Sequence, residues 1–305
     1  MPTSLTPIAA QGPKVSRFIA GYWRVNQWNK TPQELLRFAS ECLELGISTI
    51  DHAMVYRSEA TFGKALALDP GLRSQLQIVT KFGIKPMGFG ELGAQAVNHY
   101  DSSGAALIQS LDASLQGLGT DYIDILLVHR PDYLMDVREL AATMATLRAE
   151  GKVRYFGVSN FNTHQFEVLQ RELRQNVPAG LVTNQIEFSP LHLTPLEDGT
   201  LEQCQLNDCR PMLWSCLGGG NLLAPASERH QRIHNALRVV ADEHAVAALE
   251  TIVYAWVRAL PCAPLPLLGT SNIERVKTAL AAEKIQLTRE QWYRIWEAST
   301  GHPVP

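Results

Sequence analysis

Short apolar runs, rich in β-branched and aromatic residues, recur along the whole chain. Near-continuous apolar runs of this length are typical of strands in a sheet whose two faces are both covered. We therefore predict eight buried strands, at Phe18–Trp23, Ser48–His52, Gln77–Phe82, Ile123–His129, Arg154–Ser159, Leu181–Phe188, Met212–Leu217 and Ala263–Gly269.

Stretches with the apolar spacing of helices separate most of these runs. The clearest are Pro32–Leu45, Ala105–Leu118, Val137–Glu150 and Thr163–Leu173. Strands that alternate with helices predict a parallel sheet with crossover connections. Because no linker or composition shift divides the 305 residues, we predict one α/β domain, a (β/α)8 TIM barrel. The competing architecture is an open doubly wound sheet, which usually has fewer strands and an early phosphate-binding turn.

A few segments lie outside this alternation. Gly83–Ser103 is long, polar and rich in glycine, and Gly199–Arg210 and Ala224–Arg232 flank the seventh strand. We expect all three to be loops over the catalytic face that shape a substrate pocket. Leu287–Ala298 has helical spacing, with Thr288 as its expected N-cap.

Composition narrows the classes of function. The chain is 46% hydrophobic and 19% charged, with a formal net charge of −3, and it has no basic stripe of the kind that binds nucleic acid. No apolar stretch approaches the length of a membrane span, and the polar segment Met1–Arg17 lacks the apolar core of a secretory signal. The five irregularly spaced cysteines (Cys42, Cys204, Cys209, Cys216, Cys262) suit free thiols in a reducing compartment, so we expect the cytoplasm.

Polar residues follow several of the predicted strands, and these strand ends meet at one face of a barrel, where active sites lie. Asp51, Lys81 and His129 each come directly after a buried run, and Tyr56 lies five residues beyond Asp51. One such residue alone is usually a solvent-facing strand end. Three of them and a tyrosine on the same rim favour a catalytic group.

The pattern of these residues resembles the catalytic tetrad of the aldo-keto reductases, in Asp51-x-Ala53-x-x-Tyr56, Thr80-Lys81 and Leu127-Val128-His129. Four later segments resemble that family's motifs on strands five to eight: Arg154–Phe161, Asn184–Pro190, Trp214–Gly220 and Leu268–Val276. Five motifs in consistent order, from about Phe18 to Lys277, make the resemblance specific. Within the family the chain is most similar to a bacterial oxidoreductase subgroup without a settled substrate.

The resemblance implies a role for each member of the tetrad. Tyr56 is expected to be the general acid, although a free phenol has a pKa near ~10, too high for efficient transfer at neutral pH. We expect the Lys81 ammonium to lower that pKa, Asp51 to hold Lys81 charged, and His129 to orient the substrate carbonyl. His52 stands where the family commonly has threonine, either as a buried histidine with its hydrogen bonds satisfied or as a further titratable group near the site.

The resemblance also implies a nicotinamide cofactor. Ser159, Asn160 and Gln185 are expected to bind its carboxamide, and Trp214 to stack on its ring. Gly21 and Trp23 are expected at the mouth of the pocket. The backbone of one glycine-rich run is expected to lie against the pyrophosphate of the cofactor. This run is Ser215, Cys216, Leu217, Gly218, Gly219 and Gly220.

A phosphate site is expected where the last predicted strand leads into a helix, because backbone N–H groups at a helix start attract anions. The residues there are Gly269, Thr270, Ser271 and Asn272. Arg275 is expected to contact the adenosine 2′-phosphate, which favours NADPH over NADH. The chain departs from the family at Gly269, where many reductases have lysine, and at Ala279–Leu280, where they have an acidic residue and asparagine.

Three functions fit these residues. The first is NADPH-dependent reduction of aldehydes or ketones, or the reverse oxidation, by a monomer or weak homo-oligomer that acts on a small-molecule carbonyl compound, without a metal. The second is a cofactor-binding regulatory or interaction protein with little turnover, which would be free to lose Tyr56 or Lys81. The third is aldolase or isomerase chemistry at Lys81, which leaves Ser159-Asn160 and Arg275 unexplained.

Two weaker motifs are set aside. Gly88–Gly93 matches GxGxxG as a string, but it does not directly follow a predicted strand as a dinucleotide fingerprint does. His230 and His234 have the spacing of two metal ligands on one helix, but the sequence offers no third ligand nearby. We therefore interpret them as residues on a solvent-exposed helix face.

Overall fold

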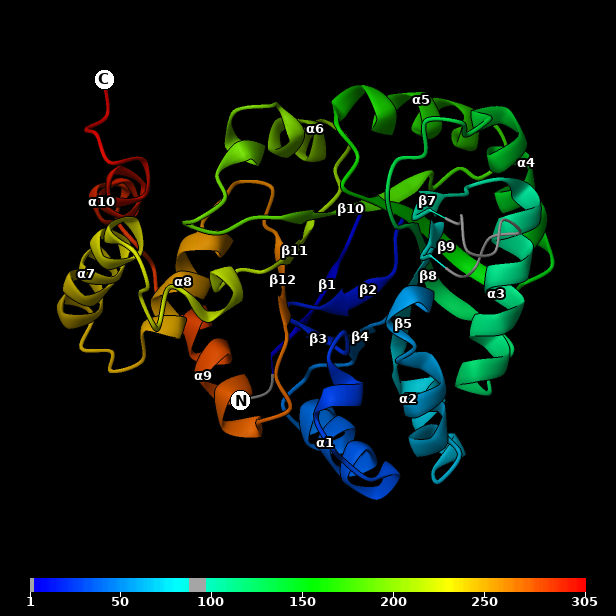
Figure 1. Cartoon of the computed structure of the whole chain (residues 1–305), viewed down its shortest axis with the longest axis horizontal. Helices are drawn as coiled ribbons and strands as arrows, with labels where there is room; N and C mark the ends of the chain where they lie inside the picture. Colours follow the sequence, from blue (N-terminus) through cyan, green and yellow to red (C-terminus); the bar gives the residue numbers. More distant parts are fainter. Residues whose placement is uncertain (1–2, 88–96) are drawn as a thin grey trace.

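Eight parallel strands close into a barrel (Figure 1), which confirms the predicted (β/α)8 fold. The structure is a computed structural model that describes residues 3–87 and 97–305. Around the barrel the strands run in the order β10, β11, β12, β3, β4, β5, β8 and β9. Their bounds are β3 Ile19–Gly21, β4 Thr49–Asp51, β5 Gln77–Phe82, β8 Ile123–Val128, β9 Val153–Ser159, β10 Leu181–Glu187, β11 Met212–Trp214 and β12 Leu265–Leu268. Each lies within or next to one of the eight predicted runs.

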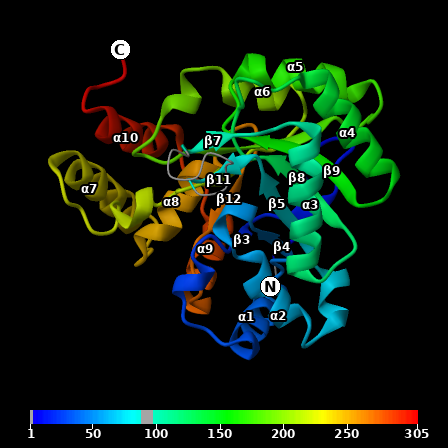
Figure 2. The same ribbon diagram turned by 45° about the vertical axis from the view of Figure 1, so that its right-hand side comes forward.

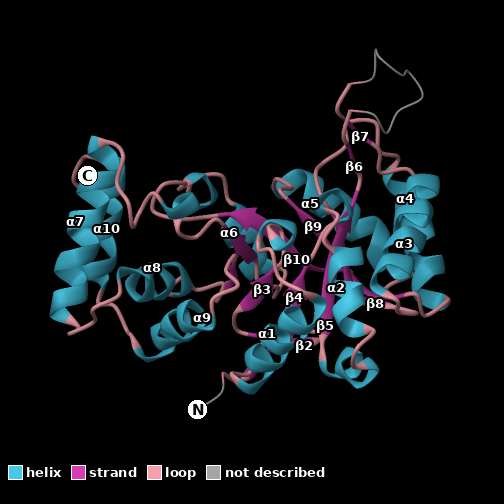
Figure 3. Cartoon of the chain, turned by 60° about the horizontal axis from the view of Figure 1, so that its bottom comes forward, coloured by secondary structure: helices cyan, strands magenta, loops and turns pink. Residues whose placement is uncertain are grey.

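Helices cover the outside of this barrel (Figures 1 and 2). Their bounds are α1 Pro32–Glu44, α2 Glu59–Leu66, α3 Gly104–Leu118, α4 Val137–Ala149, α5 Thr163–Arg174, α6 Thr200–Leu206, α7 Glu228–Glu243, α8 Leu249–Arg258, α9 Ile273–Leu280 and α10 Arg289–Thr300. α7 and α10 pack on each other beyond α8, outside the strand–helix repeat (Figure 3). Within the described ranges every helix falls short of the length and apolarity that a bilayer crossing requires.

Local sequence explains where several helices begin. Thr31, Asn162 and Thr288 are the N-caps of α1, α5 and α10, and each side chain accepts a hydrogen bond from the N–H three residues later. The side chain of that third residue bonds back to the cap, which completes a capping box. The predicted N-cap at Thr288 is therefore confirmed, and the box satisfies N–H groups that a helix start leaves free.

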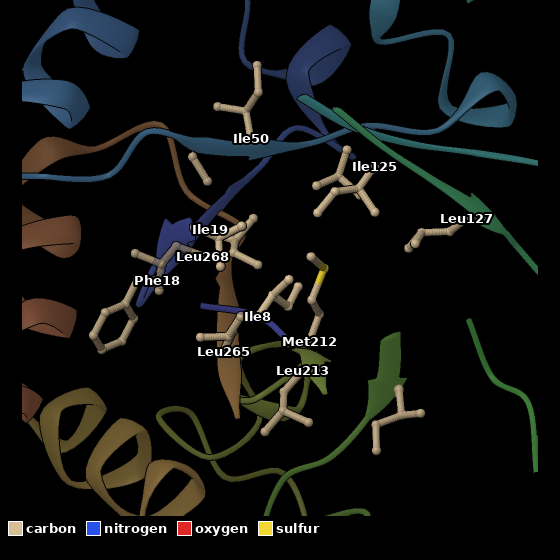
Figure 4. Packing of buried hydrophobic residues seen from close by; sticks show 14 of the residues in the cluster. Ile8, Phe18, Ile19, Ile50, Ile125, Leu127, Met212, Leu213, Leu265 and Leu268 are labelled. Carbon is tan, nitrogen blue, oxygen red and sulfur yellow. The ribbon is translucent and has the colours of Figure 1, made fainter. Parts of the chain in front are cut away.

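The barrel interior is filled by apolar side chains from all sides. Figure 4 shows Ile50, Ile125 and Leu127 across from Met212 and Leu265, all at most 1% exposed. The interior of the barrel is therefore a packed apolar core, and polar side chains gather where the strands end.

A hairpin that the sequence did not reveal closes the barrel at the end where the strands begin. Strands β1 (Leu5–Pro7) and β2 (Lys14–Ser16) pair antiparallel. Ser16 exchanges hydrogen bonds with Thr49 at the start of β4, at 2.9 and 3.0 Å. Ile8, fully buried, lies near Met212 and Leu265 in Figure 4. The segment read as a featureless polar terminus is thus the floor of the barrel.

Two of the three predicted catalytic-face loops are wrong. Gly199–Arg210 contains α6, the crossover helix between β10 and β11, and Ala224–Arg232 runs into the start of α7. The buried face of α6 includes Thr200, Gln203 and Cys204, so its apolar periodicity is weak. Gly83–Ser103 is an antiparallel ribbon at its base, β6 (Ile84–Lys85) with β7 (His99–Tyr100). The GxGxxG string at Gly88–Gly93 lies outside the described residues.

A cluster of buried rings lies behind the end of β4. The His52 ring stacks on Tyr22 at a centroid distance of 4.9 Å and also contacts Phe62, at 5.2 Å. Its Nδ1 is 2.9 Å from the Ser58 Oγ, whereas its Nε2 is buried without a partner among the described residues. The expected buried histidine is therefore only half satisfied. Burial, with a smaller effect of the Lys81 charge, lowers the pKa of His52 to about 3.

An aromatic column joins the barrel to the last helix. Phe188, directly after β10, stacks on Trp256 of α8 at a centroid distance of 5.2 Å, and Trp256 stacks on Trp292 of α10 at 4.9 Å. Each of the two indole N–H groups also donates to the backbone carbonyl of the other tryptophan, at 3.0 and 3.1 Å. Stacking and reciprocal hydrogen bonds hold α10 in one position.

The contact between α2 and α3 yields a stability prediction. A Cβ on Gly63 would lie 2.1 Å from the Gly117 carbonyl oxygen, so Gly63→Ala must push the two helices apart. We expect a loss of about 2 kcal/mol or more in the free energy of unfolding, from overpacking. The matched control is Gly117→Ala, whose Cβ meets nothing closer than 3.4 Å. Urea unfolding followed by circular dichroism measures both, and equal stabilities would contradict the close helix contact.

His52 yields a prediction about pH. An unfolded histidine binds a proton below about 6.5, whereas folded His52 does so only near pH 3. The unfolded state therefore holds more protons between these values, and stability falls as the pH drops from 7 to 5. In His52→Asn, which can still bond Ser58, we expect that fall to be smaller by about 2 kcal/mol. An unchanged difference in unfolding free energy between pH 7 and pH 5 would refute the neutral buried ring.

Candidate functional site

Three neighbouring strands and one short helix bring the four predicted catalytic side chains together. Asp51 ends β4, Lys81 lies near the end of β5, and His129 directly follows β8. Tyr56 ends a single 3₁₀ turn, Met54–Tyr56, between β4 and α2. Because β4, β5 and β8 are consecutive in the barrel, their carboxyl ends point into the same rim.

The centre of the site is a buried ion pair. The Lys81 Nζ donates to the Asp51 Oδ2 at 2.7 Å and to the His52 carbonyl oxygen at 2.8 Å, and the two side chains are 0% and 3% exposed. The Gln185 Nε2 donates to the other Asp51 oxygen at 2.8 Å. Burial by itself lowers the pKa of Lys81, but Asp51 and Tyr56 raise it by more. Lys81 therefore stays protonated, as an ammonium group, at neutral pH.

Tyr56 faces this pair and His129. The Tyr56 hydroxyl is 3.3 Å from the His129 Nε2, and the Lys81 Nζ lies 4.9 Å from the centre of the Tyr56 ring. Burial raises the pKa of Tyr56, the Lys81 charge lowers it by less, and Asp51 raises it further. The expectation that Lys81 lowers this pKa holds for the lysine alone. The net direction is upward, because the phenol is removed from water.

His129 is neutral. Burial is the main cause, and the charges of Lys81 and Arg130 add to it, so that the pKa of His129 falls to about 2. A neutral imidazole has one N–H to donate and one nitrogen to accept with. Its Nε2 can therefore share a hydrogen bond with Tyr56 and with an oxygen atom bound beside it.

The expected carboxamide-binding residues lie together on β9 and β10. The Ser159 Oγ donates to the Gln185 carbonyl oxygen at 2.8 Å, and the Asn160 Nδ2 donates to the Ser159 Oγ at 2.8 Å. Asn160 has a φ of 60°, in the left-handed region, which directs its side chain back over the strand ends. Gln185 is fixed by its bond to Asp51, so the ion pair and this group form one network.

The segment after β11 turns sharply and ends in a short 3₁₀ turn, Gly218–Gly220. Trp214, half-buried, ends the strand, and Ser215 follows with a φ of 55°. Three glycines continue with positive φ values of 57°, 68° and 101°, at Gly218, Gly219 and Gly220. Cys216 is buried, and Leu217 is packed against the core. Glycine adopts such values without strain. The N–H groups of Gly218 and Gly220 donate to the carbonyl oxygens of Ser215 and Leu217, at 2.7 and 3.0 Å.

The other predicted residues lie at neighbouring strand ends. Gly21 ends β3, and the Trp23 ring, 59% exposed, packs against Tyr56 at 6.3 Å between ring centres. Asn272 is the N-cap of α9, and its Oδ1 accepts from the Glu274 N–H. The remaining residues of this turn are Gly269, Thr270 and Ser271. Arg275 is exposed on the first turn of α9.

These groups fit a nicotinamide dinucleotide. The side-chain amide nitrogens of Asn160 and Gln185 donate hydrogen bonds to protein oxygen atoms. Their side-chain oxygens have no partner among the described residues, so both oxygens can accept a hydrogen bond from a carboxamide NH₂. A Cβ added at Gly219, Gly220 or Gly269 would meet nothing within 4 Å, so the backbone there is open to phosphates. β11 and β12 are adjacent, which puts both glycine segments on one side of the rim.

Two residues near the tetrad were not recognised from the sequence. Glu59, 5% exposed, accepts from the Thr80 Oγ1 at 2.5 Å, and burial raises its pKa. Arg130 follows His129 and lies near both Tyr56 and Trp214. The sequence could have indicated them only by position, because Glu59 lies close after Tyr56 and Arg130 directly follows His129. The helical pair His230 and His234, set aside above, bonds backbone groups of Ala226 and Leu222.

Comparison with known proteins identifies the family of the chain. The model of the Aldo/keto reductase family matches residues 17–300. The chain is 46% identical to oxidoreductase YdhF of Escherichia coli, over 98% of each chain, and 36% identical to a 6-dehydroglucose reductase of Agrobacterium fabrum, over 95% of this chain and 96% of that one. A crystal structure of the thermostable aldo-keto reductase Tm1743 with the inhibitor epalrestat shares the fold, with a TM-score of 0.79 at 23% identity over 97% of this chain and 100% of that one. The chain belongs to the aldo/keto reductase family.

Proposed function

We propose that this protein reduces aldehydes or ketones to alcohols with NADPH, and that Tyr56 is the general acid. The observation that carries the proposal is the contact of the Tyr56 phenol with His129 on one side and with the Lys81 ammonium on the other. The Lys81 charge lowers the pKa of Tyr56 against the larger upward effect of burial, so it favours the phenolate that forms as the proton leaves. The relative named as a 6-dehydroglucose reductase supports a carbonyl compound as substrate.

Each protein group has a defined task in this reaction. The reduced nicotinamide, when bound, supplies the hydride. His129, neutral, donates to the carbonyl oxygen and holds it beside the Tyr56 hydroxyl, which gives up its proton as negative charge develops on that oxygen. The Lys81 ammonium stabilises the phenolate left behind, and Asp51 keeps Lys81 in place.

The residues of the cofactor side act by positioning. Ser159, Asn160 and Gln185 would hold the carboxamide of the cofactor, and Trp214 would stack on its ring. The glycines after β11 and the start of α9 receive the phosphates. We also propose that the protein works in the cytoplasm on a small molecule; its five cysteines are all free and buried.

The two alternatives are less well supported. Schiff-base chemistry at Lys81 needs a neutral amine, but the pKa of Lys81 is raised and its ammonium donates to Asp51 and to a backbone carbonyl. A regulatory protein without turnover has no need for a proton donor that is buried and polarised between two partners.

Replacing Tyr56 tests the acid assignment. Tyr56→Phe should lower kcat by about a hundredfold or more, the usual contribution of a positioned general acid, with the Kd of NADPH nearly unchanged. The loss of NADPH absorbance with a panel of aldehydes measures turnover, and fluorescence titration measures binding. Tyr22→Phe is the matched control, because the Tyr22 hydroxyl is buried and lacks a partner among the described residues. Full activity in Tyr56→Phe would rule out the assignment.

Arg275 tests the preference for NADPH. Arg275→Ala should raise the Kd of NADPH about tenfold, the effect of losing one charge-assisted phosphate contact, and leave the Kd of NADH almost unchanged. Lys277→Ala on the same helix is the control, because the Lys277 Nζ is already paired with Glu274 at 2.7 Å. Equal effects of Arg275→Ala on the two cofactors would count against a 2′-phosphate contact.

A further inference from the structure

Arg130 places a guanidinium group inside the catalytic rim. It directly follows His129 at the end of β8 and is half-buried. Its Cζ lies 6.0 Å from the centre of the Trp214 ring, so the side chain reaches across the mouth of the barrel from β8 towards β11. Its position beside His129 in the chain and over Trp214 puts the guanidinium on the same rim as the tetrad, and its charge lowers the pKa of both Tyr56 and His129.

Within residues 3–87 and 97–305, Arg130 lacks the partners that every other half-buried arginine has. Among the described residues its side chain contacts the face of the Trp214 ring. The others are neutralised or hydrogen-bonded: Arg73 by Asp124, Arg258 by Glu283, Arg148 by the Arg154 carbonyl, and Arg210 by the carbonyls of Pro7 and Ala263. A guanidinium partly removed from water without an anion is costly, so the position is suited to an anion that arrives from outside.

The nearby carboxylates are engaged elsewhere. Both Asp132 oxygens accept from backbone N–H groups, of Ser102 at 2.8 Å and Leu134 at 2.9 Å. Glu187, beside Trp214 in the register of β10 and β11, has its carboxylate 4.0 Å from the His192 ring. Asp51 is taken by Lys81 and Gln185. The sequence also puts an arginine directly after Trp23, at Arg24, which adds positive charge to this rim.

We propose that Arg130 binds an anionic group, a carboxylate, phosphate or sulfonate, on the carbonyl substrate, so that the preferred substrates are negatively charged aldehydes or ketones. This inference rests on the proposed reductase function. The anion is assigned to the substrate because the cofactor phosphates have their own open backbone segments after β11 and β12, whereas Arg130 comes from the end of β8, beside His129. A planar guanidinium also fixes a carboxylate through two parallel hydrogen bonds, which would orient the carbonyl.

The test compares substrates that differ in charge. The probes are para-formylbenzoate and meta-formylbenzoate, each against its own methyl ester, with NADPH at saturation. For at least one isomer we expect the wild-type protein to favour the acid over the ester in kcat/KM. Arg130→Gln should then lower kcat/KM for that acid about tenfold or more, mainly through KM, with a change of less than about threefold for the ester. Arg130→Lys should keep part of the preference, because the charge remains while the planar fork is lost.

Two controls separate the possible sources of the anion. Arg138→Gln removes the same charge from the exposed first turn of α4 and should leave the acid-to-ester ratio unchanged. The Kd of NADPH should be the same in Arg130→Gln and wild type. A rise in that Kd, with acid and ester affected equally, would assign Arg130 to a cofactor phosphate and overturn the inference.

The outcomes also separate this inference from the proposed function. Wild-type reduction of both esters and both acids, with ratios that Arg130→Gln leaves unchanged, would refute the role of Arg130 while the reductase function stands. If neither the acids nor the esters nor a panel of simple aldehydes is reduced, the proposed function fails and the inference fails with it.

Discussion

The site depends on a single buried ion pair, Asp51 with Lys81. Two charges removed from water are stable only when each is fully hydrogen-bonded, and the loss of one partner typically costs about 3–5 kcal/mol. Here the partners come from separate parts of the barrel: Asp51 from β4, Lys81 from β5 and Gln185 from β10. Closing the barrel therefore also brings these side chains together, because an open sheet would leave the two charges without all of their hydrogen-bond partners.

The same burial sets the protonation states around the pair. Lys81 remains an ammonium, whereas His52 and His129 are held neutral and Tyr56 is held as the phenol. The low-dielectric surroundings disfavour every additional charge once the pair is in place. At neutral pH the rim thus holds a protonated phenol, a neutral imidazole and a fixed cation side by side.

Much of the fold could be read from the sequence, because parallel strands buried on both faces leave long apolar runs such as Gln77–Phe82 and Leu181–Glu187. The same logic fails where burial is polar: α6 hides Thr200 and Gln203 in its inner face. It also fails for β1 and β2, because strands of three residues are too short to show a periodic pattern. Their pairing depends on contacts with the end of the barrel. At the site, residue types at strand ends predicted the gathering of Asp51, Lys81, Tyr56 and His129. The net pKa shift of Tyr56 and the unpaired state of Arg130 depend on three-dimensional surroundings that no local pattern encodes.

The column of Phe188, Trp256 and Trp292 has a consequence for how the protein is made. All eight barrel strands precede residue 269, whereas Trp292 belongs to a helix that follows them in the chain. A chain that has all eight strands but lacks Trp292 leaves one face of the Trp256 indole without its cover. The last helix therefore completes the aromatic column, and a chain truncated before α10 would present an aromatic surface of the kind to which chaperones bind.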